Sequence, residues 1–458
     1  GYGLTPGIVD IALARSHGAR PELLVTVDNG IASVEGVAHA RAHGMQVLIT
    51  DHHLPGPELP AADAIVTPNR PGCSFPSKHL AGVGVAFYVL AALRAELRRR
   101  GRLAGGEPAL GMLLDLVALG TVADVVRLDR NNRVLVAAGL KRIRAGRACP
   151  GITALMQVAG REARRADAFD LGFALGPRIN AAGRLADMSV GIECLLTDDP
   201  SRAAELARDL DAINRERREI EQAMQLQAND AAEVLSGMRQ RSLVVYRSDW
   251  HQGVVGLVAS RLKERYHRPV VAFAPADAEG QWLRGSGRSI AGVHLRDVLD
   301  LVTKRQPQLI ERFGGHAMAA GLTIPHMMLE PFAEAFEQAL AESVEPRVFE
   351  RVIETDGELA PEELSLASVE LIDGTVWGQG FPPPSFEGVF EVLEQRVVGT
   401  RHLRLRLRPR AGRATVNAIA FNRTEPLERR ARLVYALRRD EYRGPAELSL
   451  HVSHAEPA

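Results

Sequence analysis

The sequence predicts an α/β protein in which two α/β units are joined by a long helix and followed by a small β-barrel. Three observations carry this prediction. Short apolar strands alternate with Ala-rich helices over the first ~140 residues, the βαβ rhythm of a parallel sheet. A helical pattern of roughly 40 residues from Asp199-Pro200 has no internal Gly or further Pro. Leucine and arginine then alternate over 403–408, with the period of two that marks strands with one wet face.

The first unit contains apolar strand-like runs at 23–27, 46–50 and 64–66, with an Ala-rich helical stretch between the first two. A helical block follows, over 81–100 and 109–119. In parallel sheets covered by helices, ligands bind at the carboxyl ends of the strands. The residues directly after the first two strands are therefore the first candidates for a functional site.

The connector is predicted from Asp199 as N-cap and Pro200 at the first helical position. Its apolar residues fall on one face, and 214–219 place charges on the other. The second unit shows strands near 242–246 and 270–273 and two Gly-rich turns, and the closing ~110 residues fit a barrel of the oligonucleotide-binding kind. We expect domains at 1–197, 198–237 (the connecting helix), 238–343 and 344–458.

Composition narrows the class of protein. The 458 residues are 46% hydrophobic and 24% charged, a globular balance that excludes wholesale disorder. The longest uncharged apolar run, 81–93, is shorter than the ~18–20 residues of a membrane helix. Three cysteines without a C-x-x-C pair indicate a reducing compartment. The net charge is zero, which does not exclude a nucleic-acid partner. Nearly all basic residues are arginine, whose planar guanidinium suits binding to phosphate, although codon bias is the simpler explanation.

Polar residues that could carry chemistry follow the first two strands. Asp51-His52-His53 ends one strand, and Asp28 ends the other before a tight Asn-Gly turn. Adjacent strand ends lie ~5 Å apart, so Asp28 and His52 can converge, whereas adjacent histidines do not easily face one metal. Imidazole and carboxylate together suit Mn, Fe, Zn or, less well, Mg. Asp124 lies in an apolar stretch, where burying an aspartate costs free energy unless it is paired or bound to a ligand. The alternative roles are helix caps for Asp51 and Asp124 and an Asx-turn for Asp28.

Three segments in this order resemble the DHH phosphoesterases: VTVDNG (25–30), TDHH (50–53) and ALGTVADVV (118–126). Within them the chain is similar to the RecJ family of bacterial single-strand-specific exonucleases. That resemblance extends over essentially the whole chain, through segments at 175–184, 210–221, 250–262, 285–290, 314–324, 378–388 and 401–408. It implies a DHH domain, a DHH-associated domain and a barrel.

The resemblance also implies residue roles at a two-metal centre. Asp28 would bridge the metals, and His52 and Asp124 would complete the shell of one. Asp51 would orient a histidine ring, and His53 would lie near the scissile phosphate. The metals would be Mn²⁺ or Mg²⁺, which acidify a water and neutralise charge on the phosphate.

Further residues would bind the nucleic acid. Two Gly turns, 285–289 and 314–316, would hold phosphate in the DHH-associated domain, and 175–184 would line the path of the strand. The two Gly segments could instead be ordinary tight turns, and 175–184 could be a polar turn. Arg184, which suits a structural role, and His251, which suits a helix cap, are weaker candidates. The candidate binding residues are Arg178, Asn180, Ser286, Arg288, Ser289, Gly315 and His316.

The implied activity is metal-dependent hydrolysis of single-stranded DNA from its 5′ end to 5′-mononucleotides, in repair and recombination. We expect a cytoplasmic monomer without membrane contact that works with a single-strand-binding protein and a helicase. The barrel would add a basic groove for the following nucleotides, in which arginine would contribute more than stacking on the few aromatic residues. Its aromatic candidates are Phe381, Phe386, Phe390, Phe421, Tyr435 and Tyr442.

One family motif has no match in this sequence. The family carries an earlier aspartate-rich D-x-D-x-D-G motif, and residues 1–27 contain nothing like it. We therefore expect a chain that lacks the first catalytic strand, holds an incomplete two-metal site and has little activity as it stands. The alternatives are another DHH phosphodiesterase acting on short oligonucleotides, cyclic dinucleotides or polyphosphate, and a non-catalytic single-strand-binding fragment.

Overall fold

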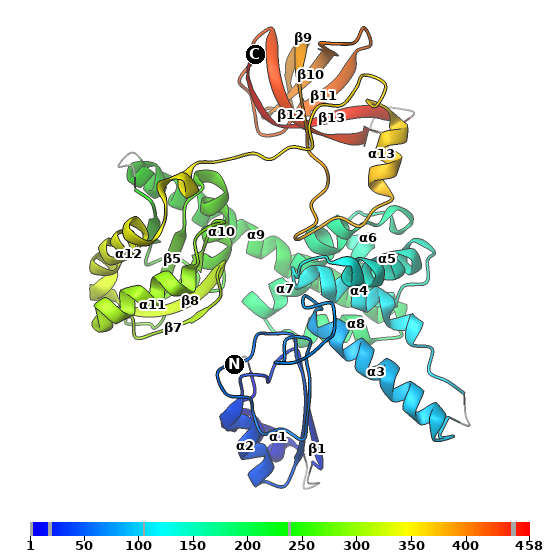
Figure 1. Ribbon diagram of the computed structural model, residues 1–458, viewed down its shortest axis with the longest axis vertical. Coiled ribbons are helices and arrows are strands. Elements are labelled where there is room, and N and C mark those ends of the chain that lie inside the picture. The colour runs from blue at the N-terminus through cyan, green and yellow to red at the C-terminus, as the bar shows by residue number, and fades with distance from the viewer. Residues whose placement is uncertain (1–2, 17–20, 104–105, 237–239, 441–445) are drawn as a thin grey trace. The chain divides into compact units, whose positions relative to one another are not determined.

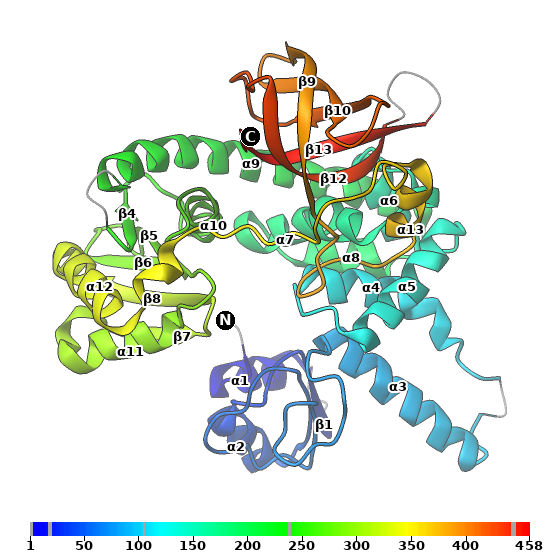
Figure 2. The same cartoon turned by 45° about the horizontal axis from the view of Figure 1, so that its top comes forward.

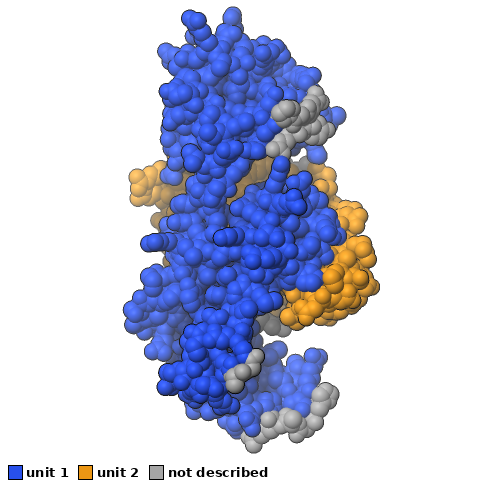
Figure 3. All heavy atoms as spheres, turned by 90° about the vertical axis from the view of Figure 1, so that its right-hand side faces the viewer, with its two compact units in different colours: residues 1–176, 354–458 blue, residues 177–353 orange. Residues whose placement is uncertain are grey.

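The computed structural model describes residues 3–16, 21–103, 106–236, 240–440 and 446–458. The chain forms two compact units: residues 1–176 with 354–458, and residues 177–353 (Figure 3). No helix among the described residues has the length and apolar character needed to cross a membrane.

The first unit contains the predicted parallel sheet, in the order β1-β2-β3, with α1 (Pro6–Arg15) and α2 (Val34–Ala42) beside it (Figure 1). Its strands are β1 (Leu23–Val27), β2 (Gln46–Thr50) and β3 (Ala64–Val66). Val47 and Ile49 on the central strand are fully buried against Val37 of α2. The register pairs Val27 with Thr50, so the first two strands end side by side.

A helical bundle completes the first part of this unit and carries the third candidate position. It contains α3 (Gly82–Arg99), α4 (Leu114–Ala123), α5 (Arg130–Arg144) and α6 (Pro150–Val158). Helix α4 is apolar nearly all round and is buried between its neighbours. Its C-cap residue is Asp124, at the point where the backbone leaves the helix.

The predicted barrel is confirmed as a closed five-stranded sheet in the order β10-β11-β13-β12-β9. Leu403, Leu405 and Leu407 point into its core, and the arginines between them point outward. Arg406 and Arg408 pair across strands with glutamates at 3.3 and 3.2 Å, so the outer face is less basic than the sequence suggests. The elements are α13 (Leu366–Asp373), β9 (Phe386–Val398), β10 (His402–Pro409), β11 (Val416–Ala420), β12 (Arg430–Asp440) and β13 (Glu447–Pro457).

The second unit is a mixed five-stranded sheet in the order β4-β5-β6-β8-β7, with helices packed on it (Figure 2). Its strands are β4 (Leu243–Tyr246), β5 (Val270–Pro275), β6 (Trp282–Arg288), β7 (Arg312–Gly315) and β8 (Ala319–Pro325). Its helices are α7 (Gly176–Leu185), α8 (Ser189–Leu196), α9 (Pro200–Ser236), α10 (Val255–Tyr266), α11 (Leu295–Arg305) and α12 (Leu329–Ser343).

The long helix is confirmed as α9, but one detail of its prediction is wrong. Asn214 and Arg217 were assigned to a charged, solvated face, and both are buried. Arg217 donates to Glu221 at 2.8 Å, and Glu221 also pairs with Arg261 of α10 at 3.3 Å. Because α10 packs against α9 here, Arg217 and Glu221 pair in a buried position instead of facing water.

Candidate metal centre

Asp28 leaves strand β1 in a conformation that is rare for its residue type. Its N–H donates to Thr50 O at 3.0 Å, which continues the ladder between the strands. Its φ angle is 63°, in the left-handed region, which costs a non-glycine residue of order 1 kcal/mol or more. Residues held in this way cluster at functional sites, because the surrounding structure must impose the conformation.

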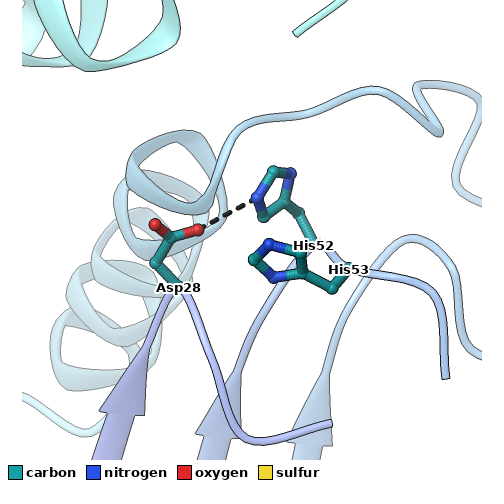
Figure 4. A group of neighbouring side chains, drawn as sticks. All are labelled: Asp28, His52 and His53. Carbon is teal, nitrogen blue, oxygen red and sulfur yellow. Dashed lines mark ion pairs between the residues drawn. The ribbon is translucent and has the colours of Figure 1, made fainter. Parts of the chain in front are cut away.

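The three predicted side chains come together at this edge of the sheet. His52 Nε2 lies 3.0 Å from Asp28 Oδ1 and 3.4 Å from Asp124 Oδ2 (Figure 4 shows the first contact). The His52 side chain is 12% exposed, whereas Asp28 and Asp124 remain partly open to solvent. The site is therefore lined by protein on the imidazole side and accessible from the carboxylate side.

His53 also faces this cluster. Ligand atoms of Asp28, His52 and His53 all lie within 4.8 Å of one another, and the two imidazole rings are 4.4 Å apart (Figure 4). Adjacent histidines were not expected to face one metal easily, yet both rings extend toward the end of β1, where Asp28 lies.

Asp51 is the buried anchor of this turn. Its side chain is 1% exposed and accepts the N–H groups of Ile31, His52 and His53 at 2.9, 2.7 and 3.1 Å. Burial alone would raise the pKa of this carboxyl, but the hydrogen bonds from His53 and the backbone outweigh it and hold the pKa below the usual value. Asp51 therefore stays ionised.

The charge on Asp51 acts on the second histidine. His53 Nδ1 donates to Asp51 Oδ1 at 2.7 Å, which fixes the tautomer and turns Nε2 toward the cluster. This hydrogen bond raises the pKa of His53 against the effect of burial, and the nearby negative charges add to it. Asp51 thus contacts the histidine pair from behind and does not itself point into the cluster.

Asp124 has the opposite electrostatic environment. Burial raises the pKa of its carboxyl, the charge of Asp28 raises it further, and His52 and His53 oppose these effects. Two carboxylates beside imidazole nitrogen form a donor set of the kind that holds Mn²⁺ and, with more oxygen ligands, Mg²⁺. The residues present therefore fit a divalent cation.

Two supporting residues were missed by the sequence argument. Gly82, the first residue of α3, allows the close approach of Asp28: a Cβ at this position would lie 2.3 Å from Asp28 Oδ1. Asn69 donates from Nδ2 to His52 O at 2.6 Å and holds the turn after β2. The small residues that open α3, Ala-Gly-Val-Gly at 81–84, were the available signal for Gly82. Asn69 gave no signal.

The expected phosphate turn at 285–289 is wrong. These residues form most of the inner strand β6, which pairs with β5 and β8 on its two sides. Ser289 is fully buried and donates to Val293 O at 2.8 Å, so its hydroxyl is not presented to a ligand. Arg288 lies at the strand end, where NH1 donates to Ser286 Oγ at 2.9 Å and Gly287 O at 2.8 Å. Burial lowers the pKa of Arg288, as does the charge of Arg184.

The other predicted binding residues divide into two groups. Arg178 is a correction: its side chain is 8% exposed and pairs with Asp211 at 2.8 Å, so it joins α7 to α9 instead of lining a strand path. Asn180 is exposed on α7, a helix where a polar turn was the alternative. Gly315 ends β7, and His316 is exposed in the hairpin to β8. Their role in binding the nucleic acid stays a prediction.

The barrel aromatics differ from the stacking surface that was expected. Phe390 and Tyr435 belong to the barrel core, and Phe386 packs against that core, so none of them offers an open face to a base. Phe381 stacks on Trp377. Phe421 is 50% exposed and lies between His402 and His451, while Tyr442 is outside the described residues.

Three family models match the chain. The "DHH family, N-terminal domain" matches residues 6–121, the "DHHA1 domain" matches residues 240–342, and the "RecJ OB domain" matches residues 355–454. Together they account for most of the chain. The matches follow one another in the order of the strand-end site, the second sheet and the barrel.

Relatives match over the full length of this chain. Single-stranded-DNA-specific exonuclease RecJ of Dickeya dadantii is 52% identical, and that of Escherichia coli is 50% identical, with 100% of this chain and 80% of each relative covered. A crystal structure of RecJ with Mn²⁺ from Thermus thermophilus has a TM-score of 0.83 at 29% identity. It covers 99% of this chain and 64% of that one. The same protein with Mg²⁺ has a TM-score of 0.73 at 27% identity, over 99% of this chain and 65% of that one.

Proposed function

Because this chain belongs to the RecJ family of single-stranded-DNA-specific exonucleases, we propose that it hydrolyses single-stranded DNA from the 5′ end at the Asp28–His52–Asp124 cluster. The observation that carries the proposal is the convergence of three side chains from separate elements. Asp28 at the end of β1 lies 3.0 Å from His52 Nε2, and Asp124 at the C-cap of α4 lies 3.4 Å from the same atom. The closed barrel favours a long single strand over a dinucleotide or polyphosphate substrate.

The cluster supplies ligands for one divalent cation, Mn²⁺ or Mg²⁺, which Asp28, His52 and Asp124 would hold. A pair of such cations would acidify a water molecule and neutralise charge on the phosphate undergoing substitution. The ligands of the second cation would come mainly from the aspartate motif that the family carries before β1. Asp51 keeps His53 in the tautomer that presents Nε2, from which His53 hydrogen-bonds the scissile phosphate.

Arg288 is the proposed contact for a phosphate of the DNA in the second unit. Arg288 donates to a hydroxyl and a carbonyl, both neutral, and burial and the positive charge of Arg184 lower its pKa. A partly buried guanidinium with these neighbours favours an anionic ligand. Ser286, Asn180 and His316 are proposed as further polar contacts, and Ser289 and Arg178 are omitted for the reasons given above.

The test uses the purified protein extended at its N-terminus by the aspartate motif that the family carries before β1, with Mn²⁺ and a 5′-labelled single strand, beside a blunt duplex of the same sequence. We expect labelled mononucleotide as the first product from the single strand and little from the duplex. His52→Ala should abolish the activity. His39→Ala is the matched control, because His39 also contacts an aspartate (Asp10, at 2.7 Å) but on an exposed surface. Equal loss in both variants, or product from the 3′ end, would contradict the proposal.

The cellular setting is proposed from family membership. We infer a cytoplasmic enzyme of repair and recombination, monomeric, that receives single strands opened by a helicase and coated by a single-strand-binding protein. The support is family membership alone. Sedimentation of the purified protein and pull-down with each candidate partner would test it.

A further inference from the structure

A loop before the barrel packs against the segment that follows Asp124. The N–H of Leu128 donates to Gln379 O at 2.7 Å. Arg133 donates from NH1 to Leu128 O at 2.9 Å, and its guanidinium lies 3.9 Å above the ring of Phe381. Both peptide groups of Leu128 are therefore held, one by the loop itself and one by an arginine that the loop covers.

This loop is itself anchored to the barrel. Phe381 stacks on Trp377, with ring centroids 5.0 Å apart and planes within 15° of parallel. Trp377 donates from Nε1 to Ile372 O of α13 at 2.7 Å, and α13 places Val369 in the barrel core. A continuous series of contacts thus runs from the barrel through Phe381 and Arg133 to Leu128. All of these residues belong to the same compact unit.

The contact is tight as well as continuous. A Cβ on Gly378 would lie 2.6 Å from Leu128 Cδ1, closer than real Cβ contacts occur, so only glycine lets the loop approach this far. Leu128 is 2% exposed, and its position is set by this packing. Movement of the loop would therefore move Leu128.

Asp124 depends on that anchor because the helix before it has ended. Val125, the next residue, has a φ angle of 59°, a left-handed conformation that is costly for a β-branched residue. Such a conformation persists only where both flanking segments are held. Helix α4 holds one side, through the N–H of Asp124 and Gly120 O at 3.0 Å, and Leu128 holds the other.

We propose that the loop Gly378–Phe381 is a positioning element of the metal centre: it fixes Leu128 and thereby sets the place of the Asp124 carboxylate. The loop acts on the cluster through the segment 125–128. This inference rests on the proposed function for the role of Asp124 as a metal ligand. The loop Gly378–Phe381 would then help to determine metal affinity, in addition to any role in binding DNA.

The first test is Phe381→Leu, which removes the aromatic face under Arg133 and retains an apolar side chain. Amide hydrogen exchange of residues 125–128, measured without metal, should become at least about tenfold faster. Mn²⁺ affinity, measured by EPR titration, should fall on the order of tenfold, as for other residues that orient a ligand. Saturating Mn²⁺ should restore kcat. Leu371→Ala, at an exposed position on α13, is the control and should change neither quantity.

A second pair of variants covers the case in which Phe381→Leu fails to fold. Gly378→Ala should weaken Mn²⁺ binding through its contact with Leu128 Cδ1, and Gly378→Ala with Leu128→Val should recover it, because valine lacks that methyl. Unchanged exchange and Mn²⁺ affinity in Phe381→Leu, or no recovery in the double variant, would overturn the proposal. Asp124→Asn separates the two claims: if it leaves Mn²⁺ affinity unchanged, the proposed function itself is wrong at this residue.

Discussion

Substitution of Gly82 by alanine tests whether the position of Asp28 governs the metal centre. The new Cβ would lie 2.3 Å from Asp28 Oδ1 and 2.7 Å from Asp28 Cβ, whereas ordinary contact begins near 3.4 Å. The carboxylate must therefore retreat by about 1 Å. A misplacement of this size in a catalytic group costs on the order of 100-fold in rate. We expect a loss of that order in kcat/KM on single-stranded DNA with Mn²⁺, and weaker Mn²⁺ binding by titration.

The folding stability of this variant should fall much less than its activity. Alanine at the start of a helix is intrinsically favourable by up to ~1 kcal/mol, which offsets part of the contact with Asp28. The matched control is Gly7→Ala, also in the first turn of a helix, where a Cβ meets nothing within 4 Å. It should match the wild type in activity and Mn²⁺ affinity. If Gly82→Ala also matches the wild type, the reasoning about Asp28 is refuted.

Four further variants separate the roles of other residues. Asp51→Ala leaves one buried and two part-buried N–H groups without their acceptor, so the unfolding free energy in urea should fall by at least ~2 kcal/mol; a change under ~0.5 kcal/mol would contradict the anchor role. Arg288→Gln should weaken binding of a 5′-phosphorylated single strand at least about tenfold at fixed salt without lowering thermal stability. Arg178→Gln should lower thermal stability, because Asp211 loses its partner, and leave binding of the single strand unchanged. Phe421→Ala should weaken single-strand binding by ~1–3 kcal/mol in a fluorescence titration, and unchanged affinity would exclude stacking there.

The convergence of Asp28 and His52 could be predicted because it depends on short-range rules. Two β-branched runs separated by one helical stretch form adjacent parallel strands, and their carboxyl ends must then lie side by side. The barrel and the long helix followed in the same way from a period of two and from an uninterrupted helical pattern. Asp124 needed the family resemblance, since its own segment indicated only a helix end.

The errors arose where packing between distant segments decides the outcome. Gly285 and Gly287 suggested a turn, but they alternate along β6, where a Cβ would strike Phe273 and Leu295, so the glycines make room for side chains from neighbouring elements. Arg178 suggested a nucleic-acid contact, but its partner Asp211 lies 33 residues along the chain. Periodicity shows that a face is buried; it does not show which residue lies opposite.

The most direct test of the account is to locate the metal. Crystals of the protein soaked in Mn²⁺ should show an anomalous difference peak bordered by Asp28, His52 and Asp124. The carboxylate oxygens of Asp28 and Asp124 already lie 3.0 and 3.4 Å from His52 Nε2. The same peak should disappear in His52→Ala crystals. A peak bound elsewhere, with the three side chains unchanged and no density between them, would contradict the claim that this cluster is the metal centre of the exonuclease.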